Sequence, residues 1–305
     1  MIPLPPSIIE TRVTLNGSPT RVLRRDVPGA PLVLFLHGFP EHSYAWVPVM
    51  QAMPPGLSCL AFDQRGFGVS HNPEPDLSGF ALRPLVDDVA DVIEASGHSH
   101  AHIVGHDWGA AVAYGMGFMR PDLTRTLTVM NGVHPIPFLR ALAAGGAQSR
   151  ASQYIPWLRS KGVEEILRAD EFAKLRALFA AHMDMSWLTG AVAELYLREW
   201  ARPRALEGML SWYRASPLPV AKPGEPIPNA ELPQLDAEAL RIRMPHLLLW
   251  GENDTALLPE AHEGLGDLCE DLRIDVLPGV DHWLHHQAPD TVAERIGRFL
   301  AAAGS

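Results

Sequence analysis

Two kinds of hydrophobic pattern alternate along the chain. Continuous apolar runs, several of which end in glycine or a polar residue, occur at 32–38, 57–63, 101–107, 123–132, 246–254 and 273–279. Such runs are typical of strands buried on both faces of a sheet. Hydrophobic residues spaced for one face of a helix occur at 80–96, 109–120, 258–269 and 288–302. Because strands alternate with helices, we expect an α/β fold with a mostly parallel central sheet covered by helices on both sides.

Two segments do not follow this alternation. Apolar and polar residues alternate over 11–25 around an Asn-Gly turn, which predicts a β-hairpin. The interval 135–233 has several helical patterns but no strand-like run, and prolines lie close together at both of its ends. We therefore expect a helical cap at 135–233, inserted into a core made of residues 1–134 and 234–305.

The composition limits the partners and the location. The 305 residues carry a formal net charge of −10, which argues against nucleic acid or an anionic membrane as the partner. No apolar stretch approaches the roughly 20 residues that span a bilayer, and the first residues lack the basic start and apolar core of a signal peptide. Cys59 and Cys269 are expected to be buried thiols in a reducing compartment. We expect a cytoplasmic protein that is a monomer or a homodimer.

The turn between the run at 101–107 and the following helix has a suggestive sequence, Gly-His-Asp-Trp-Gly. Glycines on either side allow a sharp turn, which presents the central Asp107 above the sheet at a helix N-terminus, where negative charge is favoured. A carboxylate that attacks an sp³ carbon forms an alkyl ester, which suits epoxides and alkyl halides rather than esters or amides. The alternative is that Asp107 only caps the helix.

Two further strand ends supply the remaining polar groups of such a site. Asp254 is the last residue of the run at 246–254, and His282 follows the run at 273–279. A catalytic histidine needs a carboxylate that orients its ring and stabilises its charge. Either Asp254 or Asp281 can fill that role, and we prefer Asp254 because side-chain pairing between sequence neighbours is awkward. His285 and His286 are expected at the surface of the following helix.

A fourth strand end, the segment His-Gly-Phe-Pro at 37–40, follows the first buried strand. The backbone N–H of Phe39 and that of Trp108, the residue after Asp107, are expected to form an oxyanion hole.

Two patterns look like ligand sites but do not qualify. The segment 66–70 begins like a dinucleotide-binding loop, but position 71 is histidine instead of the required glycine. His98, His100 and His102 alternate as metal ligands on a strand would, yet no cysteine or carboxylate joins them. We therefore predict neither a cofactor nor a metal ion.

Five segments together resemble the epoxide hydrolases of the α/β-hydrolase fold, namely HGFPEHSYAW, DQRGFGVS, GHDWGA, WGENDTALLP and GVDHW. The resemblance covers essentially the whole chain, and it implies that fold with an inserted helical cap. The order of nucleophile, carboxylate and histidine is that of the fold, with aspartate in place of serine. GHDWGA is specific to the branch with an aspartate nucleophile, which also contains haloalkane and haloacetate dehalogenases.

The cap distinguishes these activities. Epoxide hydrolases of this family hold the epoxide oxygen with two cap tyrosines, and the segments SWYRAS and QYIPWLRSKGVEE imply that role for Tyr213 and Tyr154. Haloacetate dehalogenases typically carry arginine after the nucleophile and a histidine-tryptophan pair in the lid. Haloalkane dehalogenases keep the tryptophan but add a second halide donor, for which this chain has no clear candidate. The chain also departs from the family at Asp281, where glycine is usual.

We therefore expect an epoxide hydrolase that converts a small apolar epoxide and water to a vicinal diol through an aspartyl ester. A dehalogenase is the near alternative. A non-catalytic protein that binds a small apolar ligand is a remote one, because every catalytic role is filled. The residues expected to contact the substrate are Phe39, Trp108, Trp157 and Trp283.

Overall fold

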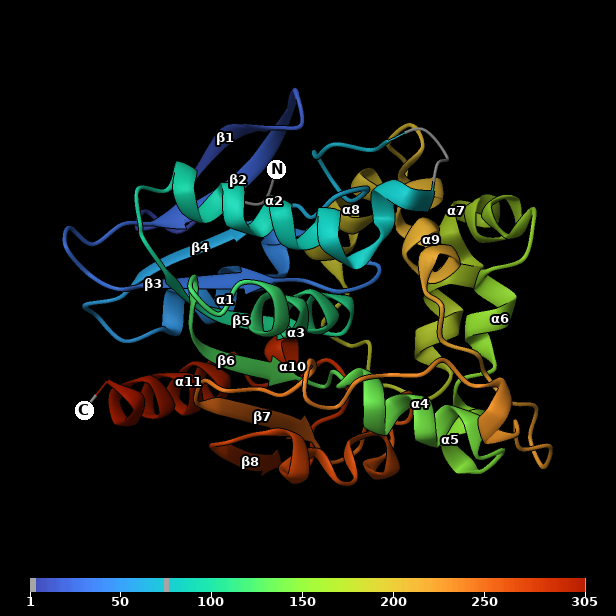
Figure 1. Ribbon diagram of the computed structural model, residues 1–305. Coiled ribbons are helices and arrows are strands. Elements are labelled where there is room, and N and C mark those ends of the chain that lie inside the picture. Colours follow the sequence, from blue (N-terminus) through green and yellow to red (C-terminus); the bar gives the residue numbers. More distant parts are fainter. Residues whose placement is uncertain (1–3, 74–76, 305) are drawn as a thin grey trace.

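The computed structural model describes residues 4–73 and 77–304, and its centre is one eight-stranded sheet (Figure 1). The strands follow the order β1-β2-β4-β3-β5-β6-β7-β8, and every neighbouring pair from β4 to β8 is parallel. The strands are β1 (Ile9–Leu15), β2 (Ser18–Arg25), β3 (Leu32–Leu36), β4 (Ser58–Phe62), β5 (Ala101–His106), β6 (Thr124–Met130), β7 (His246–Gly251) and β8 (Leu272–Leu277). The predicted α/β-hydrolase fold is confirmed.

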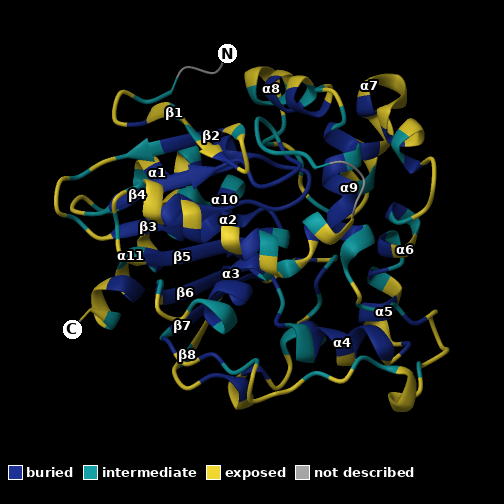
Figure 2. Ribbon diagram, turned by 45° about the horizontal axis from the view of Figure 1, so that its top comes forward, coloured by how far each residue is buried: buried dark blue, intermediate teal, exposed yellow. Residues whose placement is uncertain are grey.

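Helices cover both faces of the sheet. In β3, Leu34 belongs to the core shared with α2 and α3, whereas its neighbour Phe35 belongs to the core shared with α1 and α11, because successive side chains point to opposite faces. Figure 2 shows the central strands buried and the exposed residues on the outer surfaces. The core helices are α1 (Val47–Ala52), α2 (Leu82–Ala95), α3 (Trp108–Met119), α10 (Leu284–Gln287) and α11 (Pro289–Ala303), with 3₁₀ turns η1 (Ser43–Trp46) and η2 (Leu77–Phe80).

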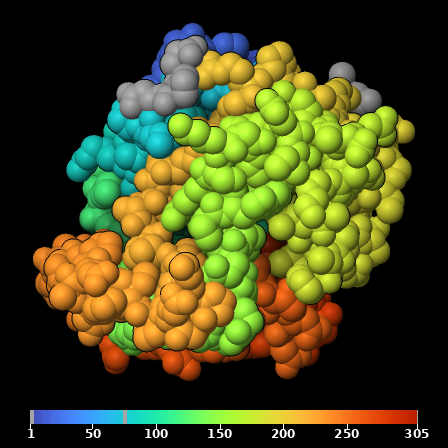
Figure 3. Space-filling model, turned by 90° about the vertical axis from the view of Figure 1, so that its right-hand side faces the viewer, coloured from blue at the N-terminus to red at the C-terminus, as the bar shows by residue number. Residues whose placement is uncertain are grey.

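Six helices lie between β6 and β7 in the chain, beside the end of the sheet where the parallel strands terminate (Figure 1). Figure 3 looks onto this side, where the chain from α5 to the segment that follows α9 (lime, yellow and orange) covers most of the face. Helix α7 consists of two pieces joined by a kink at 169–172. These helices are α4 (Pro135–Ala143), α5 (Ala147–Ala151), α6 (Tyr154–Leu158), α7 (Val163–Ala180), α8 (Gly190–Trp200) and α9 (Ala205–Ala215), followed by the 3₁₀ turn η3 (Asn229–Glu231).

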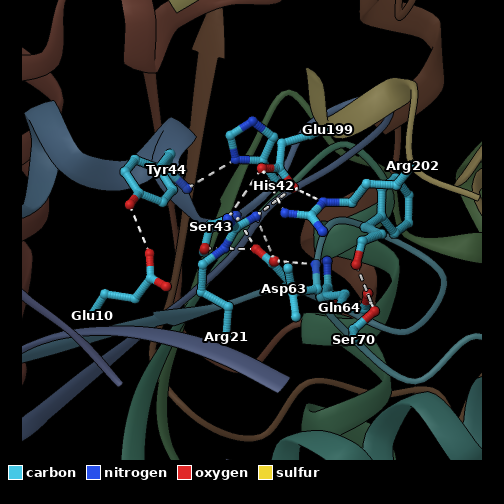
Figure 4. A network of polar contacts seen from close by, with 12 residues as sticks. Glu10, Arg21, His42, Ser43, Tyr44, Asp63, Gln64, Ser70, Glu199 and Arg202 are labelled. Atoms are coloured by element: carbon cyan, nitrogen blue, oxygen red, sulfur yellow. Dashed lines mark hydrogen bonds and ion pairs between the residues drawn. The ribbon is translucent and has the colours of Figure 1, made fainter. Parts of the chain in front are cut away.

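A buried network of charges joins α8 to the sheet. Arg21 of β2 lies between Asp63, at 2.7 Å, and Glu199 of α8, at 2.9 Å (Figure 4). Asp63 also accepts hydrogen bonds from the backbone N–H and the hydroxyl of Ser43, and Glu199 also pairs with Arg202. Each buried charge therefore has an opposite partner, which is the condition under which burial of charge is tolerated.

The predicted hairpin is confirmed, since β1 and β2 pair antiparallel around Asn16 and Gly17. Two expectations are wrong. The segment 258–269 forms only two 3₁₀ turns, η4 (Pro259–His262) and η5 (Leu265–Leu268), because Gly264 takes a left-handed conformation between them. Strand β8 is not buried on both faces, because it is the edge strand and leaves Ile274 and Val276 exposed.

Both cysteines are free and buried, as expected. In the described part of the chain, no helix combines the length and the apolar character that a membrane span requires.

Candidate active site

Asp107 lies on the sharp turn between β5 and α3. Its backbone angles, φ 51° and ψ −119°, are rarely adopted by residues other than glycine and indicate local strain. A Cβ atom on Gly109 would overlap the carbonyl oxygen of Leu36, so only glycine lets α3 approach β3 this closely. The turn thus places the Asp107 carboxylate above the sheet, at the positive end of α3.

The loop after β3 packs directly on this carboxylate. The backbone N–H of Phe39 donates to Asp107 Oδ1 at 2.7 Å. A side chain at position 38 would overlap the Asp107 side chain, which explains the glycine before Phe39. One carboxylate oxygen is therefore held by a backbone donor, as expected for one half of an oxyanion hole.

The other oxygen faces His282, which follows β8. The distance from His282 Nε2 to Asp107 Oδ2 is 3.7 Å, and on the far side of the ring His282 Nδ1 lies 2.8 Å from Asp254 Oδ2. Asp254 follows β7, and its Oδ1 accepts the backbone N–H groups of Ala256 and Leu257 at 2.8 and 3.0 Å. The carboxylate that orients His282 is thus Asp254.

Asp281, the other carboxylate considered for that role, has different partners. It accepts hydrogen bonds from the backbone N–H of Trp283 at 3.0 Å and from that of Asp184 at 2.6 Å. Asp184 lies in the segment between α7 and α8. Asp281 therefore connects the loop that carries His282 to the chain above it, and it does not pair with the histidine.

The charges around His282 change its protonation. Burial disfavours the charged ring, but the charge of Asp254 and its hydrogen bond outweigh burial and, together with Asp107, raise the pKa of His282 to about 9. Burial likewise opposes ionisation of Asp254, yet His282 and the backbone donors lower the pKa of that carboxyl. The resting site therefore holds an imidazolium between two carboxylates.

Both predicted tyrosines lie over Asp107. Tyr154 begins α6 and Tyr213 belongs to α9, and their ring centroids are 6.2 Å apart with the planes nearly perpendicular. The ring of Tyr213 also packs edge-on against Phe39 and Trp108, at 5.1 and 5.0 Å. Burial, reinforced by the charge of Asp107, raises the pKa of both phenols, so both stay protonated and can donate.

Two cavities meet at these residues, with volumes of about 270 and 330 Å³. Asp107, Tyr154 and Tyr213 line both of them. Trp108 lines the smaller cavity, whereas Phe39 and His282 line the larger one.

Trp157 and Trp283 are among the lining residues of neither cavity. Trp283 is fully buried and packs against Phe179 and His282, with ring centroids 5.3 and 5.0 Å away. Trp157 packs on the hydrophobic core from its partly buried position. The structure does not support a substrate contact for either indole.

Known proteins resemble this chain in sequence and in structure. Residues 31–289 match the family model of the α/β hydrolase fold. Human epoxide hydrolase 4 is 30% identical over 285 residues, a match that covers 89% of this chain and 73% of that protein. A solved structure from a study of novel epoxide hydrolases in metagenomes of hot environments gives a TM-score of 0.83 at 30% identity, covering 96% of this chain and 98% of that one. The epoxide hydrolase of Bacillus megaterium gives 0.82 at 26% identity, covering 95% and 100%.

The chain belongs to the epoxide hydrolases of the α/β-hydrolase fold. Its predicted family and enzyme class are therefore confirmed.

One residue that supports the site of this epoxide hydrolase was missed. Asn131 follows β6, is fully buried, and donates from Nδ2 to Asp254 Oδ2 at 2.6 Å. Its Oδ1 accepts the backbone N–H of Gly251 at 2.7 Å, so the side chain ties β6 to the end of β7 and holds Asp254. A signal was present in the sequence, because Asn131 is a polar residue at the end of a buried strand, as Asp254 is.

A buried cluster behind His282 was also missed. His106 Nε2 lies 2.8 Å from the carbonyl oxygen of His282, and Glu41 lies 3.4 Å from His106 Nδ1. Glu41 also contacts His285 at 3.1 Å and His286 at 2.6 Å. The expectation that these two histidines lie at the surface is wrong, because both contact Glu41. This glutamate follows the His-Gly-Phe-Pro segment.

Ligand atoms of Glu41, His106 and His285 lie within 4.8 Å of one another, so this cluster has the donors that a metal ion needs. Each of the three already has a partner in the cluster or in the loop of His282. The histidines at 98, 100 and 102 do not converge and instead contact, one each, Ser96, Ser99 and Thr126.

Proposed function

We propose that this epoxide hydrolase opens its substrate by covalent catalysis at Asp107. Because Oδ1 is held by the N–H of Phe39, the attacking atom is Oδ2. Oδ2 forms a bond to one ring carbon while the bond from that carbon to the ring oxygen breaks. Tyr154 and Tyr213 hold the leaving oxygen and supply its proton, so the product of this step is an ester of Asp107 that carries a neighbouring hydroxyl.

In the second step water hydrolyses the ester. His282 Nε2 takes a proton from water, and the resulting hydroxide attacks the carbonyl carbon of the Asp107 ester. The N–H groups of Phe39 and Trp108 stabilise the negative charge that develops on the former Oδ1. Collapse of this intermediate breaks the bond between the Asp107 carbonyl carbon and the substrate oxygen. The two protons of the attacking water, now on His282 and on the Asp107 carboxyl, pass to this oxygen and to the tyrosinate left by the first step. The vicinal diol leaves, and the carboxylate of Asp107, the neutral His282 and the phenol are restored.

The arrangement of Asp107 between Phe39 and His282 carries this proposal. An Asp107 that served only as a helix cap would hydrogen-bond the first turn of α3, and no such side-chain bond is made. Its oxygens instead face an oxyanion-type donor and a histidine, the two groups that hydrolysis of an Asp107 ester requires.

A paired assay of the purified protein tests the proposed reaction against that of a dehalogenase. One arm offers racemic styrene oxide and measures the diol by chromatography, and the other offers 1-bromobutane and measures bromide. We expect diol without bromide. Bromide without diol would contradict the assignment of the tyrosines and would make Trp108 a halide donor.

A further inference from the structure

The fully buried carboxylate of Glu41 lies behind the catalytic loop, and in the described chain its ionic partners are all histidines: His106, His285 and His286. The buried carboxylates of the network in Figure 4, by contrast, pair with arginine. Burial lowers the pKa of His285 to about 3, so this ring is neutral near physiological pH and supplies no positive charge. A buried carboxylate of this kind needs a cation beside it.

His106 turns a ring nitrogen towards the carboxylate without donating to it. Its Nε2 lies 2.8 Å from the carbonyl oxygen of His282, and because a carbonyl oxygen only accepts, Nε2 carries the proton. In the neutral ring Nδ1 then has a free lone pair. This Nδ1 lies 3.4 Å from Glu41 Oε2 and makes no hydrogen bond within the described chain. Two acceptor atoms that face each other in this way repel unless a positive charge lies between them.

The distances around Glu41 Oε2 favour a metal ion over a proton as that charge. His106 Nδ1 and His285 Nε2 lie 3.4 and 3.1 Å from this oxygen. A proton between an imidazolium and a carboxylate brings the two atoms to about 2.7–2.9 Å, as His282 and Asp254 show at 2.8 Å. Two ligands of one tetrahedral ion, each about 2.1 Å from it, lie about 3.4 Å apart. Both separations exceed the hydrogen-bond range and approach the spacing of metal ligands.

The groups behind these ligand atoms are placed as they are around bound metal ions. A ligating histidine usually donates its other N–H to a carbonyl or a carboxylate, as His106 does to His282. Ligating carboxylates are hydrogen-bonded in turn, and Glu41 Oε1 lies 2.6 Å from His286 Nε2 and accepts the hydroxyl of Tyr196 at 3.0 Å. These contacts fix the carboxylate while Oε2 faces the two ring nitrogens.

We propose that Glu41 Oε2, His106 Nδ1 and His285 Nε2 bind one divalent transition-metal ion, and that this ion is Zn²⁺. The three ligand atoms lie within 4.8 Å of one another, and two imidazoles with one carboxylate form a ligand set that Zn²⁺ accepts. The ion joins the loop after β3, the end of β5 and α10 behind His282. Its role is structural, and it takes no part in the proposed reaction. The sequence did not indicate this site because its ligands come from three distant segments.

The metal content of the whole protein tests this inference. The chain, without a histidine tag, is produced in a metal-depleted medium and in the same medium with Zn²⁺ or Co²⁺, so that the ion can enter during folding. A chelator then removes loosely bound metal, and mass spectrometry of the metals gives the content of each preparation. We expect one Zn²⁺ or Co²⁺ per chain, with a visible spectrum typical of four-coordinate cobalt. X-ray absorption should give nitrogen and oxygen neighbours at about 2.0–2.1 Å from zinc.

Two variants locate the ion. His285→Gln removes one ligand but keeps a polar side chain, and its metal content should fall to that of the chelated buffer. His102→Gln is the matched control, because His102 is also a buried histidine but contacts Thr126 outside the cluster, and this variant should keep one ion per chain.

The melting temperature Tm separates loss of the ion from loss of the fold. The parent protein produced with Zn²⁺ should melt roughly 5 °C above the parent protein produced without it, because an ion that binds only the folded chain stabilises it. His285→Gln should unfold cooperatively in both preparations, with the same Tm.

Three results would overturn the inference. If the parent protein holds no Zn²⁺ or Co²⁺ above the buffer, the charge between His106 and Glu41 is a proton. If His285→Gln retains the ion, the ion lies elsewhere. If the Tm of the parent protein does not depend on Zn²⁺, the ion has no structural role. None of these results bears on the proposed function, which the formation of diol from styrene oxide tests separately.

Discussion

At the scale of single residues, the two oxygens of Asp107 have different partners. Oδ1 accepts the N–H of Phe39, and Oδ2 faces His282 across 3.7 Å. This asymmetry separates the two steps of the proposed reaction. The free oxygen attacks the substrate, and the held oxygen becomes the carbonyl oxygen that a backbone donor already stabilises when water attacks.

The two tyrosines should act in the first step. Removing one phenolic hydroxyl, in Tyr154→Phe or Tyr213→Phe, leaves the ring oxygen with one donor and should slow ester formation about 100-fold. The double variant should form no measurable diol. Rapid-quench kinetics of ester formation provides the measurement.

Tyr44→Phe is the matched control, because that hydroxyl bonds Glu10 on β1 and lies outside both cavities. Ester formation by the two single variants at the rate of the parent protein would contradict a role for these phenols.

The second step should depend on pH through His282. With its pKa raised to about 9 by Asp254 and Asp107, the ring is protonated in the resting enzyme and cannot take a proton from water. Formation of the ester removes the charge of Asp107, so the pKa falls and the neutral ring becomes accessible. The rate of ester hydrolysis should therefore rise with pH and reach its plateau at a pH lower than about 9.

Single-turnover measurements of ester decay between about pH 6 and pH 9 test this dependence. A decay rate that is constant over the whole interval would mean that no group with such a pKa acts as the base.

At the scale of elements, the parallel strands bring the reacting groups together. Phe39 follows β3, Asp107 follows β5, Asp254 follows β7 and His282 follows β8. Because parallel strands end at the same edge of the sheet, residues far apart in the sequence converge there. The helices between β6 and β7 lie over this edge and add the two tyrosines.

The buried pair between Arg21 and Glu199 is one of the contacts that attach these helices to the sheet. Glu199→Gln keeps the shape of the side chain but leaves Arg21 with Asp63 as its one close anionic partner, which should lower the free energy of unfolding by about 2 kcal/mol or more. Urea unfolding gives this difference. Limited proteolysis should show earlier cleavage between α7 and α9.

Glu207→Gln is the control, because its pair with Arg168 is exposed and should change stability by less than about 0.5 kcal/mol. Equal effects of the two substitutions would show that the buried Arg21–Glu199 pair contributes no more to the free energy of unfolding than the exposed pair does.

At the scale of the whole molecule, the fold could be predicted from patterns that are local. Apolar runs, apolar–polar alternation and helical spacing depend on neighbouring residues only, and the first two of these patterns located every described strand of the sheet. Polar residues at or after the ends of the predicted strands also indicated three candidate site residues, Asp107, Asp254 and His282. The helix expected at 258–269 failed for a local reason as well, since Gly264 interrupts an otherwise helical spacing.

Contacts between distant segments could not be predicted in this way. His285 and Glu41 are separated by 244 positions, and nothing in the sequence near either residue indicates that the other lies beside it. The placement of Trp283 depends in the same way on Phe179 and the packing of α7 above it. Amphipathic side chains such as tryptophan and histidine suit both core and cavity, so only the assembled molecule shows which role each has.

The central claim is that Asp107 becomes an ester that His282 hydrolyses, and intact-protein mass spectrometry of His282→Gln tests it most directly. With the base removed, styrene oxide should add its own mass once to the protein, and peptide mapping should locate the addition on Asp107. The variant Asp107→Asn,His282→Gln should add nothing. An unmodified His282→Gln protein that still produces diol, or a modification at another residue, would contradict the mechanism.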